Sequence, residues 1–203
     1  MTIKTVLFDF GGVLIQLANP QPREALAARY NMTSDELTTI VYLQESAQLA
    51  TLGKITAQEH WEKVGEKFNL TSQELDNFKN DFWRGDKLDM DLVRFVRELR
   101  PQYTTGLLSN AWGDLRKSLT DEMGIIDAFQ HVFISAELGI AKPDQKIYQY
   151  VIEHLDCEPH EIVFLDDMLK NVEAARQAGL NAIHFRNREQ ALGELRELLD
   201  NEL

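Results

Sequence analysis

The sequence of 203 residues contains a single cysteine, Cys157, and no long apolar segment. One thiol cannot form an intramolecular disulfide, which excludes a disulfide-stapled secreted domain and favours a reducing compartment. No run approaches the roughly 18 apolar residues that a membrane-spanning helix requires. The first residues lead directly into a strand-like segment and do not resemble a secretory signal. We therefore expect a cytoplasmic protein.

Basic residues are also scarce, with 21 Lys and Arg against 33 Asp and Glu, and the formal net charge is -12. Nucleic-acid surfaces show basic stripes, and anionic membrane surfaces attract polybasic segments. We therefore expect neither nucleic acid nor a membrane as a partner. The same bulk charge would repel an anionic small molecule, so binding one requires a local cationic site.

Short apolar runs alternate with amphipathic helical patterns over most of the chain. Strands are predicted at 5–8, 103–108, 131–134, 162–165 and 182–185, and helices at 89–100, 112–120, 143–155, 169–178 and 188–199. Proline 143 is expected in the first turn of its helix. Strands separated by single helices predict an α/β fold with a doubly wound parallel sheet.

Between residues 22 and 83 the pattern is entirely helical. Three Thr-x-x-Glu capping boxes mark helix starts, namely Thr33 with Glu36, Thr56 with Glu59, and Thr71 with Glu74. We therefore predict a catalytic core at 1–15 and 86–203, interrupted by an inserted helical cap at 16–85. Movement of this cap would control access to a site on the core.

Polar residues follow the predicted strands at the edge where ligands of open α/β sheets bind. Asp9, followed by two glycines, is placed to attack an electrophile, and the adjacent Asp166 and Asp167 are typical of a hard-cation site. The alternative for each is a helix or turn cap.

Two further polar features lie at the same edge. Ser109 and Asn110 offer a hydroxyl, an amide and a helix N-terminus to an anion, and Lys142 could neutralise charge during a reaction. Taken singly, Ser109 and Asn110 are better explained by helix capping, and Lys142 by a solvated surface position. Their order along the chain, each after a strand, favours one shared site.

The four segments resemble the motifs of the haloacid dehalogenase-like hydrolases. They are LFDFGGVL at 7–14, LLSN at 107–110, AKPD at 141–144 and FLDD at 164–167. The helical insert is similar to that family's helical cap, and the fold implied for the core is Rossmann-like. Within the family the sequence most resembles the sugar-phosphate phosphatases related to α-D-glucose-1-phosphate phosphatase.

The resemblance implies a Mg²⁺-dependent phosphatase in which Asp9 is the nucleophile and a metal ligand. It implies that the backbone carbonyl of Gly11 and the carboxylate of Asp167 also bind Mg²⁺, with Asp166 as a second ligand or a neighbour. The expected phosphoryl-binding groups are Ser109, the amide of Asn110, and Lys142, which would bridge the phosphate and the nucleophile.

Gly11 departs from the family pattern, which has a second aspartate here as general acid and base. Such a group is typically worth about 10²–10⁴-fold in rate. We therefore expect substrates whose leaving group departs with little help, such as a sugar 1-phosphate, an acyl phosphate or an aryl phosphate.

Two alternatives remain open. A metal-independent 2-haloacid dehalogenase of the same fold is compatible with Gly11 but does not need Asp166 and Asp167. A catalytically degenerate binding or regulatory protein is supported only by Gly11. Of the tryptophans, Trp61 is expected in the core of the insert, Trp83 near a hinge, and Trp112 at the mouth of the site.

Overall fold

The central sheet is parallel throughout in the computed structural model, which describes residues 2–200. Its strands are β1 (Thr5–Phe8), β4 (Thr104–Ser109), β5 (His131–Ile134), β6 (Ile162–Asp166) and β7 (Asn181–His184), in the order β5-β4-β1-β6-β7. Strand β1 is central, with Phe8 paired to Leu107 of β4 and to Leu165 of β6. The predicted doubly wound α/β fold is confirmed.

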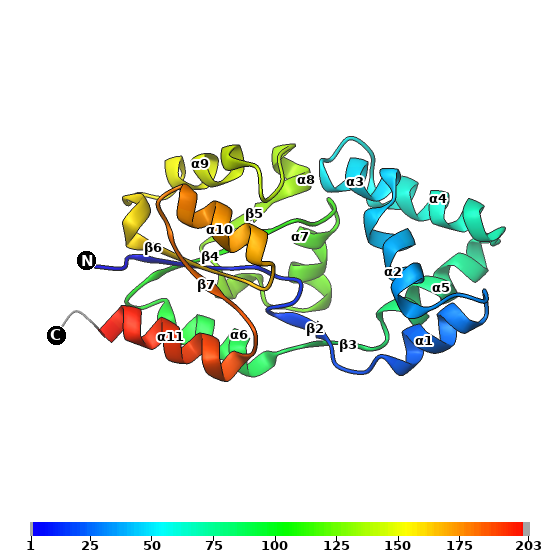
Figure 1. The fold of residues 1–203 in the computed structure, drawn as a ribbon, viewed down its shortest axis with the longest axis horizontal. Coiled ribbons are helices and arrows are strands. Elements are labelled where there is room, and N and C mark those ends of the chain that lie inside the picture. The colour runs from blue at the N-terminus through cyan, green and yellow to red at the C-terminus, as the bar shows by residue number, and fades with distance from the viewer. Residues whose placement is uncertain (1, 201–203) are drawn as a thin grey trace.

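Helices cover both faces of this sheet (Figure 1). Helices α6 (Met90–Leu99) and α11 (Arg188–Asp200) lie on one face, and α9 (Gln145–Glu153) and α10 (Leu169–Gln177) lie on the other. Successive strand residues point to opposite faces, so Val6 and Phe8 pack with α6 and α11 while Leu7 packs with α9 and α10. Two apolar cores therefore hold the sheet and fix where its strands end.

The inserted segment forms a separate helical block with its own apolar core. Its helices are α1 (Gln21–Ala28), α2 (Ser34–Leu43), α3 (Glu45–Thr51), α4 (Ala57–Phe68) and α5 (Ser72–Trp83). All three predicted capping boxes form, with each threonine hydroxyl accepting from the backbone of its glutamate. Trp61 packs inside this block, as expected.

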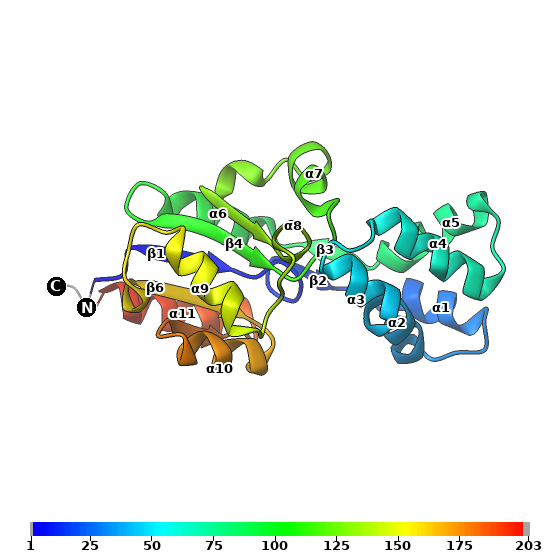
Figure 2. The same cartoon turned by 90° about the horizontal axis from the view of Figure 1, so that it is seen from above.

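A short two-stranded ribbon, which the sequence did not indicate, links the two parts. Strands β2 (Ile15–Leu17) and β3 (Asp86–Leu88) pair antiparallel where the chain leaves and re-enters the core. The block lies beyond the carboxyl ends of the parallel strands (Figure 2). We propose 16–85 as the cap and 1–15 with 86–203 as the core. Residue 1 and residues 201–203 lie outside the described part.

Two predicted helices begin later than expected. Pro143 lies before α9, after a cis peptide bond, and Asp144 caps the helix by accepting from the backbone of Lys146. The helix predicted at 112–120 is instead α7 (Leu115–Lys117) followed by a π-helical turn (Ser118–Glu122). Ahead of it, the backbone N–H of Ala111 donates to the Ser135 hydroxyl at 3.0 Å.

The remaining short elements connect these units. They are α8 (Ser135–Leu138) and two 3₁₀ turns, Ile126–Ala128 and Pro159–Glu161. Between residues 2 and 200, no helix has the length and apolar character needed to cross a bilayer.

Candidate active site

Asp9 sits at the end of the central strand with its carboxylate held from two sides. Its backbone N–H extends the sheet by donating to Leu165 at 2.9 Å, and its Oδ1 accepts from the backbone N–H of Phe10 at 2.7 Å. The residue is only 7% exposed. A buried carboxylate whose Oδ1 is held in this way, at this edge, is suited to act as a positioned nucleophile.

Lys142 lies between two carboxylates, and its side chain is fully buried. Its Nζ is 3.0 Å from Asp9 Oδ1 and donates to Asp166 Oδ2 at 2.7 Å and to the Leu108 carbonyl at 2.9 Å. Burial alone would lower the pKa of Lys142, but Asp9 and Asp166 outweigh it and hold that pKa above its usual value. The ammonium is therefore a fixed positive charge beside the candidate nucleophile.

Asn110 positions this lysine through its backbone. The Asn110 side-chain amide donates to the Lys142 carbonyl at 2.8 Å, and its Oδ1 accepts from the Lys142 N–H at 2.8 Å. We call these two hydrogen bonds the Asn110 clasp. The sequence indicated an anion-binding role for Asn110 and gave no sign of the clasp. Ser109 is buried at the end of β4, and its hydroxyl has no partner within residues 2–200. Phosphoryl binding by Ser109 and Asn110 stays a prediction.

The two adjacent aspartates occupy different environments. Asp166, the last residue of β6, is fully buried and accepts from the Met168 N–H at 2.8 Å and from the Asn171 amide at 2.9 and 3.1 Å, besides Lys142. Both of its oxygens therefore already have donors. Asp167 is half-buried, and its carboxylate lies against Gly12, where the absence of a Cβ allows the approach; the left-handed backbone there (φ 76°) also favours glycine.

Asp9, Asp166 and Asp167 each place a carboxylate oxygen within 4.8 Å of the others. Burial raises the pKa of Asp9 to about 7, against the opposing effect of Lys142, and Asp166 raises it further. Burial and the charge of Asp166 also raise the pKa of Asp167. When all three carboxyls are ionised, they and one ammonium leave two negative charges, and oxygen ligands suit a hard divalent cation such as Mg²⁺.

Gly11 borders this cluster on the open side. It is exposed, and a Cβ placed on it would have no heavy atom within 4 Å. Steric crowding therefore does not explain why residue 11 is a glycine and not an aspartate. Asp9 is the only acidic residue among residues 9–12. No second carboxyl group in this segment can therefore donate a proton to the leaving group.

Trp112, three residues beyond Ser109, contacts the helical block, and its expected place at the mouth of the site stays a prediction. Its ring lies 5.7 Å from Trp61 and 4.5 Å from His60. His60 was not expected to have a role at the site. It is fully buried, burial lowers its pKa, and its Nδ1 lies 2.9 Å from the Ser46 hydroxyl. We interpret it as a packed neutral histidine that helps hold Trp112.

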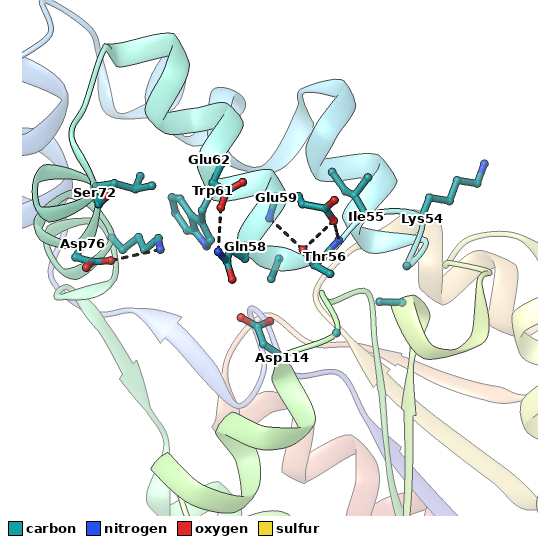
Figure 3. A pocket seen from close by; sticks show the side chains of 16 residues that line it. Lys54, Ile55, Thr56, Gln58, Glu59, Trp61, Glu62, Ser72, Asp76 and Asp114 are labelled. Atoms are coloured by element: carbon teal, nitrogen blue, oxygen red, sulfur yellow. Dashed lines mark hydrogen bonds and ion pairs between the residues drawn. The ribbon is translucent and has the colours of Figure 1, made fainter.

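A cavity of about 840 Å³ lies between the block and the core, and Trp61 is on its wall (Figure 3). Asp114 of the core faces Gln58 and Trp61 across it. Lys79 Nζ, also on its wall, lies 5.8 Å from the Trp61 ring and 3.6 Å from Asp76. The described residues that line this cavity do not include the three clustered aspartates. The cavity therefore borders the junction without forming the carboxylate site.

A model of the haloacid dehalogenase-like hydrolases matches residues 3–179. The chain is 27% identical over 199 residues to the sesquiterpene phosphatase astK of Aspergillus oryzae, covering 98% of this chain and 97% of that protein. It is 24% identical over 209 residues to the D-ribitol-5-phosphate phosphatase of Bacteroides thetaiotaomicron, covering 98% and 100%.

Its fold is similar to that of a crystal structure from the same bacterium. That structure is a HAD family enzyme in complex with magnesium and inorganic phosphate, with a TM-score of 0.74 and 23% identity over 89% of this chain and 93% of that one.

Proposed function

The chain belongs to the haloacid dehalogenase-like hydrolases, and we propose that it is a Mg²⁺-dependent phosphatase that cleaves small phosphomonoesters through an aspartyl-phosphate on Asp9. The observation that supports this most strongly is the position of the buried Asp9 carboxylate. It lies 3.0 Å from the Lys142 ammonium and within 4.8 Å of oxygens from Asp166 and Asp167. This arrangement offers a nucleophile, a fixed cation and a set of metal ligands at one edge.

The proposed reaction has two displacements at phosphorus. An Asp9 oxygen forms a bond to phosphorus while the bond to the ester oxygen breaks, and the leaving group takes that electron pair. Water then attacks the same phosphorus, releases inorganic phosphate and restores the Asp9 carboxylate. Lys142 offsets the repulsion between this carboxylate and the phosphate dianion, and the Ser109 hydroxyl is free to donate to a phosphoryl oxygen.

Mg²⁺ would be held by Asp9, Asp167 and the carbonyl of Gly11, and would supply positive charge to phosphoryl oxygens. Asp166 is better suited to positioning than to direct ligation, because its oxygens already accept from Lys142, Met168 and Asn171. This choice refines the expectation that Asp166 is either a ligand or a neighbour of the metal.

The leaving group should depart without a proton from residue 11. A sugar 1-phosphate, an acyl phosphate and an aryl phosphate all meet this condition, because their leaving oxygens are more acidic than an ordinary alcohol. Membership of the family does not indicate which of these three ester classes is the substrate. The two relatives above are named for a sesquiterpene phosphate activity and for D-ribitol 5-phosphate.

A panel of phosphomonoesters with Mg²⁺ tests this proposal, with Asp9→Asn as the matched blank. We expect phosphate release from at least one ester by the wild type at 10³-fold or more above Asp9→Asn, and loss of that release in EDTA. Equal rates in both proteins on every ester would refute the proposal. A parallel arm measures chloride release from 2-chloropropionate in EDTA, which would instead support a dehalogenase.

A further inference from the structure

All three tryptophans of the chain gather at the junction between the helical block and the core. Trp112 comes from the core, and Trp61 and Trp83 come from the block. The Trp61 ring lies 5.7 Å from Trp112 and 6.4 Å from Trp83, and the Tyr42 ring lies 6.1 Å from Trp112 and 5.8 Å from Trp83. We name these four side chains the junction cluster.

The junction cluster begins at the same edge of the sheet as the carboxylate site. Trp112 follows the end of β4, and β4 pairs directly with β1, which leads into Asp9. The carboxyl ends of the strands point toward the block, and so does the end of α10 that begins at Leu169 (Figures 1 and 2). A substrate whose phosphate binds at Asp9 would therefore have its body between the strand ends and the block.

Apolar side chains at this junction remain open to solvent. Tyr42 is 38% exposed and Trp83 is 37% exposed, although both belong to the junction cluster. On the core side, Met168 and Leu169 directly follow Asp167 and are 45% and 49% exposed. The other exposed large apolar side chains among residues 2–200 are Leu43 at the end of α2, Leu17 in the β2–β3 ribbon and Met90 at the start of α6.

Tyr42 contacts both Trp83 and Trp112, so these rings form one patch and are not single apolar residues scattered over the surface. Exposed apolar side chains that gather in one place mark a binding surface. Met168 and Leu169 add exposed apolar surface directly after the candidate metal ligand Asp167. The cavity lined by Trp61, Lys79 and Asp114 does not share this character, because charged side chains line it.

We propose that the substrate is an aryl phosphate, the phosphate ester of an apolar phenol, whose hydrocarbon body packs against Tyr42, Trp83 and Trp112. The inference rests on the phosphatase activity proposed above and narrows its substrate class. Aromatic rings also stack on sugars, but Leu43, Met168 and Leu169 offer sugar hydroxyls no hydrogen-bonding partner. Displacing water from a hydroxyl without such a partner disfavours binding.

A series of 4-alkylphenyl phosphates tests the proposal, because lengthening the alkyl group hardly changes the acidity of the phenol. We expect kcat/KM to rise about two- to fourfold for each methylene from phenyl to 4-butylphenyl phosphate, and to exceed the value for glucose 1-phosphate. A flat series, or a preference for glucose 1-phosphate, would overturn this inference and leave the phosphatase function intact. Absence of any hydrolysis above Asp9→Asn would overturn the function itself.

A binding measurement tests the proposed substrate class without relying on catalytic activity. Trp83 and Trp112 belong to the proposed surface, and Trp61 also lines the charged cavity, so the Asp9→Asn protein for this measurement carries Trp61→Phe as well and its tryptophan fluorescence reports on the surface. We expect 4-butylphenylphosphonate to change the emission saturably in Mg²⁺, with a Kd at least tenfold below that of methylphosphonate. Equal Kd values for the two phosphonates, or no change in emission, would contradict the proposal.

Variants then separate recognition from folding. Trp83→Ala and Tyr42→Ala should reduce the ratio of kcat/KM between 4-butylphenyl and phenyl phosphate at least fivefold, and Trp83→Phe should restore most of it. The control is Tyr150→Ala, which truncates a half-buried ring on α9 that stacks on His154. An equal loss on both esters in the junction variants would indicate a structural role only and would refute the assignment.

Discussion

Replacing Gly11 by aspartate should give the site the proton donor that it lacks. The position accepts the change, because a Cβ there meets no heavy atom within 4 Å and the residue is exposed. Gly11 is also not among the glycines with a left-handed backbone, so aspartate adopts its conformation without strain. The substitution therefore adds a carboxyl group beside Asp9 with little disturbance of the fold.

The magnitude depends on the leaving group. A general acid is worth about 10²–10⁴-fold where the departing oxygen needs a proton, so hydrolysis of an alkyl phosphate should rise about 100-fold, or about 2.7 kcal/mol in activation free energy. The phenolate of 4-nitrophenyl phosphate leaves without a proton, so its hydrolysis should change less than about threefold. The free energy of unfolding should change by no more than about 0.5 kcal/mol, as for other exposed substitutions.

The assay compares kcat/KM for n-butyl phosphate and 4-nitrophenyl phosphate in the wild type, Gly11→Asp and Gly11→Asn. Asparagine matches aspartate in size and cannot transfer a proton, so it controls for any effect on the metal site. The reasoning is refuted if Gly11→Asp and Gly11→Asn behave alike. It is also refuted if aspartate accelerates both esters by the same factor.

Three further predictions concern the charges of the site. Lys142→Met should lower the free energy of unfolding by about 3–5 kcal/mol, measured by urea denaturation in EDTA, because Asp9 and Asp166 are left buried without their cation; a loss under 1 kcal/mol would contradict this. Gly12→Ala should raise the Mg²⁺ concentration for half-maximal activity at least tenfold, since its Cβ would lie 2.3 Å from the Asp167 carboxylate; unchanged Mg²⁺ dependence would show that this carboxylate is not a ligand. Mg²⁺ at 100 times its Kd should stabilise the wild type by about 2.7 kcal/mol, and thermal melting should show little of this gain in Asp167→Asn.

The location of the site could be predicted because strand ends obey a simple rule. Asp9 and Asp166 each close an apolar run, and parallel strands bring their carboxyl ends to one edge. The capping boxes could also be predicted, because their contacts are local. Thr56 and Glu59, for example, are three residues apart. Local chemistry of this kind needs no knowledge of the rest of the chain.

Contacts between distant segments could not be predicted. The clasp of Asn110 on the Lys142 backbone joins residues 32 positions apart, and nothing near Asn110 indicates its partner. The different surroundings of Asp166 and Asp167 arise from strand alternation and from the turn at Gly12. Two adjacent aspartates in a sequence give no sign of this difference.

The two short strands of the ribbon and the junction cluster were missed for related reasons. Strands of three residues are too brief for an alternating pattern to emerge. The cluster assembles side chains from α2, α4, α5 and the segment after β4, and only the docking of the block on the core brings them together.

The most direct test of the account is to look for the phosphoryl group on Asp9. The protein is mixed with ³²P-labelled 4-nitrophenyl phosphate in Mg²⁺, quenched in acid within one turnover and digested. We predict label on the peptide that contains Asp9, removed by hydroxylamine and absent from Asp9→Asn. Release of inorganic phosphate by the wild type with no label on that peptide, or equal labelling of Asp9→Asn, would contradict the central claim.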